Sequence, residues 1–297
     1  MNIATTTAGS DANPRRLDID QLRNAAVLLL IVFHTARLFD GEDWHIKDAG
    51  RYVAADLVVR GLNLMSMPLL FLLAGASIAF SMKTRSVGAF ATERVSRLLV
   101  PLLAGCVLFV LPQVWVERHA HGAAGRYSPI DFDGSLLAFA PSFFECCYPQ
   151  ANFSWHHLWF VAYVLVFALI SIPVFAWLRS ASGASAIDRF ASALERWPAA
   201  VWLINVPNLI VSFTLGPRWP TTHDLVSDWA NFTGSLLTFL WGFVFASSPK
   251  LLGMVERRRR EFVAAAIVFS AAFFTLREVR AQPFVELASA YMGMAWI

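Results

Sequence analysis

The sequence predicts an all-α protein, a polytopic transmembrane helix bundle with seven spans and the start of an eighth. Of its 297 residues, 57% are hydrophobic and only 15% are charged, and the mean hydropathy is +0.54. Soluble domains carry about 25% charged residues. Apolar runs near the length of about 20 residues that crosses a bilayer recur along the chain. A lipid bilayer therefore explains the missing charge.

Each run has a local reason to be helical and membrane-embedded. The first is free of proline and glycine, the second contains the small residues Ala74 to Ser77 that suit helix packing, and tryptophans precede the fourth as an interfacial belt. The fifth is interrupted by Pro207, and the seventh follows a basic sequence, ERRRR. The seven predicted spans are 22–39, 57–80, 98–115, 158–178, 199–215, 232–246 and 262–276, and the eighth begins in 283–297.

The domain organisation is simple. Residues 1–15 are polar and lack the apolar core of a signal peptide, so we expect a disordered tail there. Residues 16–297 form a single predicted transmembrane domain. The three cysteines form no CxxC pair, and the sequence predicts no metal site and no bound cofactor.

The basic residues indicate an orientation. Alternate loops hold 15 of the 24 lysines and arginines if the N-terminus is cytoplasmic, as the positive-inside rule requires. The net charge of +3 therefore reflects membrane orientation, and we expect no nucleic-acid partner. All seven histidines then fall on or near the outer side.

The first predicted span carries the strongest candidate for chemistry. Arg23 and His34 are eleven residues apart, which is three helical turns, so they share a face and lie about 16 Å apart along the axis. Asp20 precedes Arg23 by three residues and can pair with it. An ionisable group inside a span marks a functional site by default. His34 is favoured as functional, whereas Arg23 taken alone suits an interface anchor equally well.

Three further clusters are candidates. Arg94 and Arg97 would point to one side of a helix start, as a phosphate clamp or a positive-inside anchor. His156 and His157 could bind an acceptor or hold a loop, and His45 lies in another outer loop. Asp224 and Asp228, at i and i+4, would share a helical face and bind sugar hydroxyls, or form an exposed lead-in to the sixth span.

The ordered set of motifs resembles the membrane acyltransferase family 3. Arg23 with His34, Arg94 with Arg97, and MPLLFLLAG at 67–75 are similar to that family's signatures. The stretches HTARLFD, WHIKD, FSWHHLWF and THDLVSDWANF resemble the branch of bacterial glucan succinyltransferases. Ala74 stands where relatives often carry serine. The resemblance covers the chain from Arg16 to about Arg260.

The resemblance implies a reaction and a set of roles. An acyl group would pass from a cytoplasmic acyl-CoA co-substrate to a hydroxyl of an extracytoplasmic carbohydrate, in the bacterial inner membrane. His34 would be the catalytic base with Arg23 as its motif partner. Arg94 and Arg97 would bind donor phosphates. His45, His156, His157, Asp224 and Asp228 remain candidates on the acceptor side.

Two alternatives stay open at this point. A proton-coupled transporter or flippase could use the same histidines as a proton relay. Family members usually have about ten spans and a distal tyrosine-histidine motif. We therefore expect this chain to be truncated at its C-terminus, and an inactive remnant is the second alternative.

Overall fold

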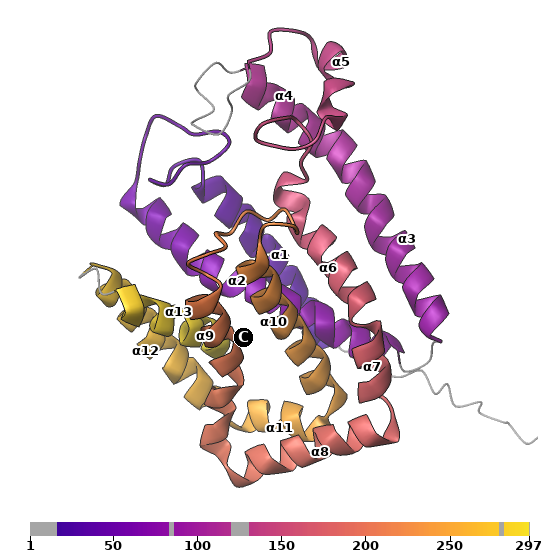
Figure 1. Ribbon diagram of the computed structural model, residues 1–297. Coiled ribbons are helices and arrows are strands. Elements are labelled where there is room, and N and C mark those ends of the chain that lie inside the picture. The colour runs from indigo at the N-terminus through magenta and orange to yellow at the C-terminus, as the bar shows by residue number, and fades with distance from the viewer. Residues whose placement is uncertain (1–16, 83–85, 120–130, 279–281, 297) are drawn as a thin grey trace, which may run out of the picture.

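A computed structural model describes residues 17–82, 86–119, 131–278 and 282–296, and every regular element among them is a helix (Figure 1). The predicted all-α class is confirmed. The tail predicted for residues 1–15 lies outside the described residues.

The helices follow one another along the chain, with longer non-helical segments after α1 and α9. Up to Leu178 the chain forms α1 (Leu17–Ala36), α2 (Val53–Ser81), α3 (Val87–Gly105), α4 (Leu111–His119), α5 (Leu136–Phe139), α6 (Trp159–Ile170) and α7 (Ile172–Leu178). The remainder forms α8 (Ala181–Arg196), α9 (Val206–Thr214), α10 (Trp229–Ser247), α11 (Pro249–Arg257), α12 (Arg259–Glu278) and α13 (Gln282–Trp296). Four short turns of other helical types are η2 (Cys106–Val110), η4 (Ser142–Phe144), η5 (His156–Leu158) and η6 (Pro198–Asn205).

The number of spans differs from the sequence-based count. Four helical stretches are long and apolar enough to cross a membrane: Ile19–Ala36, Val53–Ser81, Val87–His119 and Trp229–Ser247. Two bent pairs raise the number to six if each pair counts as one span. Seven spans and the start of an eighth are not confirmed among the described residues. Charged residues at both ends shorten the apolar part of α12, and α13 has only 15 residues.

Prolines account for the positions of the breaks. The predicted fourth span bends by 55° between α6 and α7, where Pro173 occupies the first turn of α7. Pro207 also begins a helix, α9, and does not interrupt one. Proline lacks an amide hydrogen and is favoured in a first helical turn, which suits Pro173 and Pro207. Pro68 and Pro101 lie inside α2 and α3 without ending them.

The centre of the bundle is the contact between α2 and α10, which depends on two glycines. A Cβ atom on Gly75 would lie 1.8 Å from the carbonyl oxygen of Phe239, and one on Gly242 would lie 1.9 Å from that of Leu72. Small residues allow two helix backbones to approach this closely. The packing role predicted for residues 74–77 is confirmed at Gly75.

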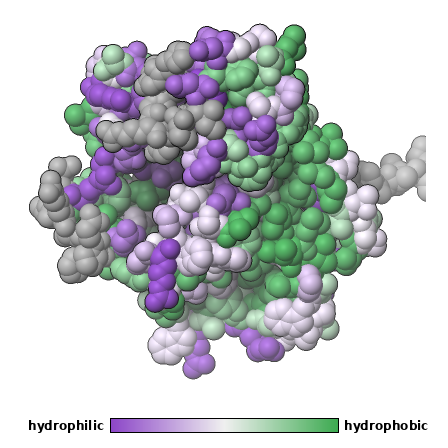
Figure 2. Space-filling view, turned by 45° about the horizontal axis from the view of Figure 1, so that its top comes forward, coloured by the Kyte–Doolittle hydropathy of each residue, from purple (hydrophilic) through white to green (hydrophobic). Residues whose placement is uncertain are grey.

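The surface is suited to lipid. Side chains on α1 and η2 are more than half exposed although they are apolar, including Leu28 at 62% and Phe109 at 64%. Figure 2 shows apolar residues forming one broad continuous area, with hydrophilic residues gathered elsewhere in the view. Exposed apolar surface on this scale indicates an integral membrane protein.

The two ends of the bundle differ in chemistry. We call the end that holds His34, His45, Glu117, His156 and His157 the histidine end; it lies at the top of Figure 1, beside α4 and the start of α6. We call the opposite end, formed by α8 and α11, the basic end. There Lys250 Nζ lies 2.6 Å from Asp188, and Arg257 lies 3.3 Å from Glu195, so ion pairs join the two amphipathic helices.

Candidate functional site

His34 lies in the last turn of α1 and is half-buried at the histidine end. Its ring centroid is 5.9 Å from that of Trp44 and 6.0 Å from that of His157. Three segments therefore meet here: the end of α1, the loop that follows it, and η5, which leads into α6. A half-buried imidazole with a second imidazole beside it can accept and pass on a proton.

His157 and His156 occupy η5, and they face different surroundings. His157 is exposed, whereas the side chain of His156 is 1% exposed. His156 has φ 41, in the left-handed region that non-glycine residues seldom adopt. The Nε1 atom of Trp155 donates to the carbonyl oxygen of His223 at 2.7 Å and fixes this segment to the loop before α10.

Glu117, near the end of α4, joins two of the histidines. Its Oε1 atom lies 3.0 Å from Nδ1 of His45 and 3.1 Å from Nε2 of His156. The two imidazole rings stack with centroids 4.2 Å apart and 13° between their planes. The ligand-type atoms of these three residues all lie within 4.8 Å of one another. Among the described residues, they are the group that could hold a metal ion.

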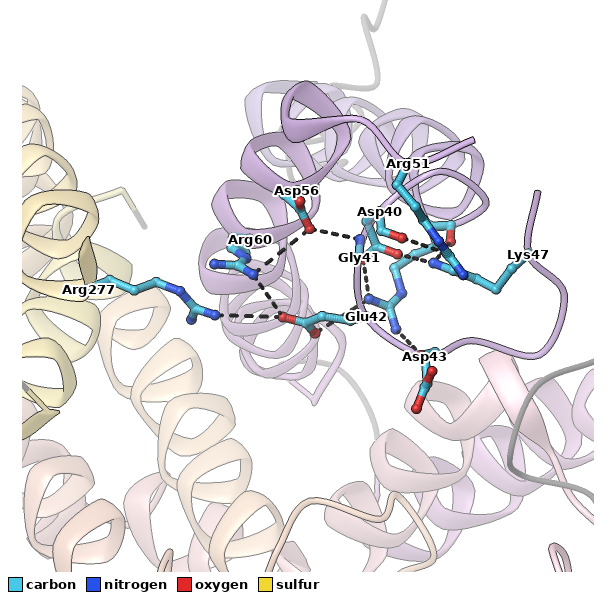
Figure 3. A network of polar contacts seen from close by, with 10 residues as sticks. Asp40, Gly41, Glu42, Asp43, Lys47, Arg51, Asp56, Arg60 and Arg277 are labelled. Atoms are coloured by element: carbon cyan, nitrogen blue, oxygen red, sulfur yellow. Dashed lines mark hydrogen bonds and ion pairs between the residues drawn. The ribbon is translucent and has the colours of Figure 1, made fainter. Parts of the chain in front are cut away.

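The loop that supplies Trp44 and His45 is fixed by a network of charges (Figure 3). The fully buried Asp40 accepts hydrogen bonds from Arg37 and Lys47, and its carbonyl oxygen accepts one from Arg51 at 2.8 Å. The guanidinium of Arg37 also lies 4.5 Å above the ring of Trp44. The residues of this charge network come from both the start and the end of the loop. The network therefore fixes the shape of the loop next to His34.

A second buried arginine shapes the other wall. Arg118 is fully buried, and its Nε donates to Oδ1 of Asn152 at 3.0 Å. Its Nη2 donates to the carbonyl oxygens of Pro149 and Ala151 at 3.1 and 2.6 Å. Arg118 thus joins α4 to the segment that leads to His156.

The predicted contact between Asp20 and Arg23 is present, with Nη1 3.2 Å from Oδ1. Arg23 also donates to the hydroxyl of Ser77 on α2. The arginine is therefore directed toward the neighbouring helix, away from the histidine end. Arg23 and His34 both lie in α1, and eleven helical residues correspond to about 16 Å along its axis.

Arg94 and Arg97 do not act as an equivalent pair. Arg94 is half-buried, donates to the hydroxyl of Ser81 at 2.8 Å and lies over the ring of Phe90. The side chain of Arg97 is 71% exposed and pairs with Glu93 at 3.0 Å. Both lie on α3, but only Arg94 is held against the bundle.

The interpretation of Asp224 and Asp228 as one helical face is wrong. The segment before α10 is a loop, because His223 and Leu225 adopt positive φ angles of 59 and 68. Asp228 is fully buried at the start of α10. Asp224 is exposed and accepts from the amides of Val226 and Ser227.

The carboxylate of Asp228 accepts several hydrogen bonds from within the protein. It accepts from the hydroxyl of Tyr163 at 2.5 Å and from Nδ2 of Asn231 at 2.7 Å. The amides of Thr222 and His223 donate to it at 3.0 and 3.1 Å. Burial lowers the pKa of His223, against an opposite effect of Asp228 and Asp224. Asp228 therefore organises the loop and is not available to a substrate.

A large cavity of about 1630 Å³ lies within the bundle. Its walls come from α1, α2, α6, η6, α9, α10, α11, α12 and α13, and its lining includes His223 and Trp219 in the loop before α10 and Glu256 and Arg259 at the junction of α11 and α12. Leu22, next to Arg23, also lines it. The cavity is amphipathic, and its lining residues belong to both ends of the bundle.

Sequence reasoning missed Glu117, Arg118 and Trp44. Glu117 and Arg118 are adjacent charges at the end of an apolar run, which is the same signal that drew attention to His34. Their partners lie in other segments and could not be inferred from spacing. His45 and His156 were singled out, but their shared partner was not.

Comparison with known proteins now identifies the family. The acyltransferase domain of the acyltransferase 3 family matches residues 16–291. Glucans biosynthesis protein C of Salmonella paratyphi B is 21% identical over 217 residues, which are 72% of this chain and 50% of that protein. The protein of the same name from Salmonella typhimurium is 21% identical over 197 residues, 65% of this chain and 47% of its own length.

The chain thus spans about half the length of these curated relatives. No solved structure matches it. The relatives support the glucan-modifying branch indicated by the sequence motifs. Because the family match covers nearly the whole chain, this protein belongs to the acyltransferase 3 family.

Proposed function

We propose that this protein transfers an acyl group from a cytoplasmic acyl-CoA to a hydroxyl of an extracytoplasmic carbohydrate. It would do so within the bacterial inner membrane, with its N-terminus in the cytoplasm. Family membership supports the acyl transfer. The relatives named glucans biosynthesis protein C support a carbohydrate acceptor.

The observation that carries the proposal is the placement of His34. This imidazole is half-buried at the histidine end, close to His157 and Trp44. A general base needs to be within reach of the acceptor hydroxyl and shielded enough to hold its proton. A half-buried His34 fits the need for shielding, and the exposed His157 beside it supports the proposal that an acceptor can approach this base.

The proposed step is a direct transfer. His34 takes the proton of the acceptor hydroxyl as its oxygen attacks the thioester carbonyl carbon. The new carbon–oxygen ester bond forms, the carbon–sulfur bond breaks, and the CoA thiolate leaves with the electron pair. The proton on His34 then neutralises the thiolate directly or through solvent, so the base returns to its starting form.

Arginines at the other end of α1 and on α3 would bind the donor. Arg23 is directed by Asp20 and Ser77, and Arg94 is held by Ser81. Guanidinium groups recognise phosphate oxygens well. Arg97 would assist from the exposed surface. The basic residues of α8 and α11 at the basic end support a cytoplasmic position for these groups.

The candidates for acceptor binding differ in whether their side chains are exposed or engaged in contacts inside the protein. His157 and Asp224 are exposed and can meet an acceptor. His45 and His156 contact Glu117, and Asp228 is occupied by internal hydrogen bonds. We therefore assign acceptor binding to His157, Trp44 and Asp224.

The test is transfer of a labelled acyl group in membranes that contain the full chain. His34→Ala should lower both CoA release and acyl-glycan formation by about 10²- to 10⁴-fold, the usual contribution of a general base. His119→Ala, an exposed histidine on α4, is the matched control and should leave the rate unchanged. Undiminished transfer by the His34 variant would refute its catalytic role.

A transporter or flippase is the second candidate, and the large cavity beside α2 and α10 favours it. This function predicts movement of a substrate across the membrane without cleavage of a thioester. The same membranes distinguish the two, because only an acyltransferase releases free CoA.

A further inference from the structure

The proposed reaction leaves three ligand-type side chains at the histidine end without a role. They are His45 from the loop after α1, Glu117 from α4 and His156 from η5. Each comes from a different segment, and their donor atoms all lie within 4.8 Å. The side chains of Glu117 and His156 are both 1% exposed, and that of His45 is 18% exposed.

Hydrogen bonding within this cluster is incomplete. Nε2 of His156 and Oε1 of Glu117 form a hydrogen bond at 3.1 Å. Nδ1 of His45 is equally near Oε1 of Glu117, at 3.0 Å, but the two atoms do not form a hydrogen bond. Oε2 of Glu117 is buried and has no hydrogen-bond partner among the described residues. Buried polar atoms left without a partner require an explanation such as a bound ion.

We propose that His45, Glu117 and His156 bind one divalent transition-metal ion, with zinc as the best fit. Two imidazoles and one carboxylate form a set used by zinc sites with an open fourth position. Bonds of about 2.0–2.2 Å in a tetrahedral site place ligand atoms roughly 3.3–3.5 Å apart. The two short separations from Glu117 are near these values. The rings are nearly parallel, so one imidazole turns toward the ion as it binds.

The surroundings hold the three ligands in place. Tyr148 packs edge-on against His156 with centroids 4.9 Å apart and lies 5.9 Å from the ring of His45. Arg118, next to Glu117, fixes the loop before His156 through Asn152. Backbone strain at His156, with φ 41, is typical of a position over-determined by its surroundings for a functional purpose.

The three residues of the proposed metal site are not neighbours in the sequence. The histidine nearest to Glu117 in the sequence is His119. It stacks on Trp115 and lies near the carbonyl oxygen of Phe132, outside the proposed site. The ligands of the proposed site are instead 39 residues or more apart in sequence. His119 therefore supplies a control histidine outside the site and on the same helix.

The experiment measures metal bound to the full chain purified in detergent. The protein is stripped with a chelator, loaded with zinc and dialysed, and zinc is counted per chain by mass spectrometry. Wild type and His119→Ala should each hold about one zinc ion, whereas Glu117→Gln and His45→Ala should bind at least about 100-fold more weakly. Thermal unfolding of wild type should shift upward with zinc, and that of the two ligand variants should not.

Cobalt(II) provides a readout that needs no variant. Loaded into the wild type, it should show the intense visible d–d absorption of a four- or five-coordinate site. Wild type that holds no zinc and gives no such absorption overturns the proposal, as does equal zinc binding by both ligand variants. Because no assay here measures acyl transfer, failure of the metal site is distinct from failure of the proposed function.

Discussion

The imidazole rings of His34 and His157 lie with their centroids 6.0 Å apart, at an interplanar angle of 71°, and join the end of α1 to the start of α6. The half-buried ring belongs to the proposed base and the exposed ring to the acceptor side. This arrangement separates two effects that activity measurements can distinguish.

His157→Ala should raise KM for the acceptor by about tenfold and change kcat less, because it removes binding and leaves the base intact. His34→Ala should lower kcat itself. The measurement is steady-state transfer at several acceptor concentrations. If His157→Ala lowered kcat as much as His34→Ala does, His157 would take part in the chemical step.

Ser77→Ala should raise KM for the acyl-CoA donor by about tenfold, since it removes one charge-assisted hydrogen bond that directs Arg23. Arg23→Gln should have a larger effect on the same constant. Thr214→Ala is the control, because that exposed hydroxyl bonds to a carbonyl of its own helix, α9. An unchanged donor KM in both α1–α2 variants would exclude Arg23 from donor binding.

Asp228→Ala should destabilise the protein by about 3 kcal/mol or more, because it leaves several buried donors without an acceptor. Tyr163→Phe removes one of those bonds together with the bond that the amide of Leu225 donates to the Tyr163 hydroxyl, and it should cost about 1–2 kcal/mol. Asp224→Ala, at an exposed carboxylate, serves as the control. Unfolding in micelles, followed by circular dichroism, measures the loss of stability in each variant. Equal losses for the Asp228 and Asp224 variants would contradict the prediction.

Gly242→Ala should destabilise the bundle by at least about 1–3 kcal/mol, because the new Cβ would overlap the backbone of α2. Gly61→Ala is a matched change on α2, where a Cβ meets nothing within 4 Å. Alanine favours a helix over glycine by up to about 1 kcal/mol, so this variant should be neutral or stabilised. Thermal unfolding of both variants in the same detergent tests this: the unfolding temperature should fall for Gly242→Ala and stay the same or rise for Gly61→Ala.

Stability should decline in mild acid through His223. Burial lowers the pKa of this residue from 6.5, so the unfolded chain takes up the proton first as the pH falls. The contribution is fully present above about pH 6.5 and is lost progressively below it. His223→Gln should therefore show a smaller drop in unfolding temperature between pH 7.5 and 5.5 than wild type. His119→Gln should retain the wild-type drop, and an unchanged pH profile for His223→Gln would exclude this group.

The fold class could be predicted from the sequence, and His34 could be singled out as a candidate, because both follow from the cost of burying polar groups in a bilayer. The close packing at Gly75 follows from the need for small residues where helices approach. These inferences use one segment at a time. The contact of Arg23 with Asp20 lies within a single helix, so it too could be predicted from spacing.

The rest depends on long-range geometry. The partnership of Glu117 with His45 and His156 arises because three separate segments converge at one end of the bundle. Periodicity placed Asp224 and Asp228 on one helix face, but the left-handed residues His223 and Leu225 make that segment a loop. Whether α12 crosses the membrane also cannot be read from its apolar core, because its terminal charges shorten it.

The charge network of Figure 3 extends beyond the loop that it fixes. Glu42 lies 3.5 Å from Arg60 on α2 and 3.9 Å from Arg277 near the end of α12, so the loop after α1 is fastened to a helix from the far end of the sequence. The loop beside His34 is thereby tied to both α2 and α12. Under the proposed function, a loop held in this way would favour acceptors that fit its existing shape, without a closing movement over them.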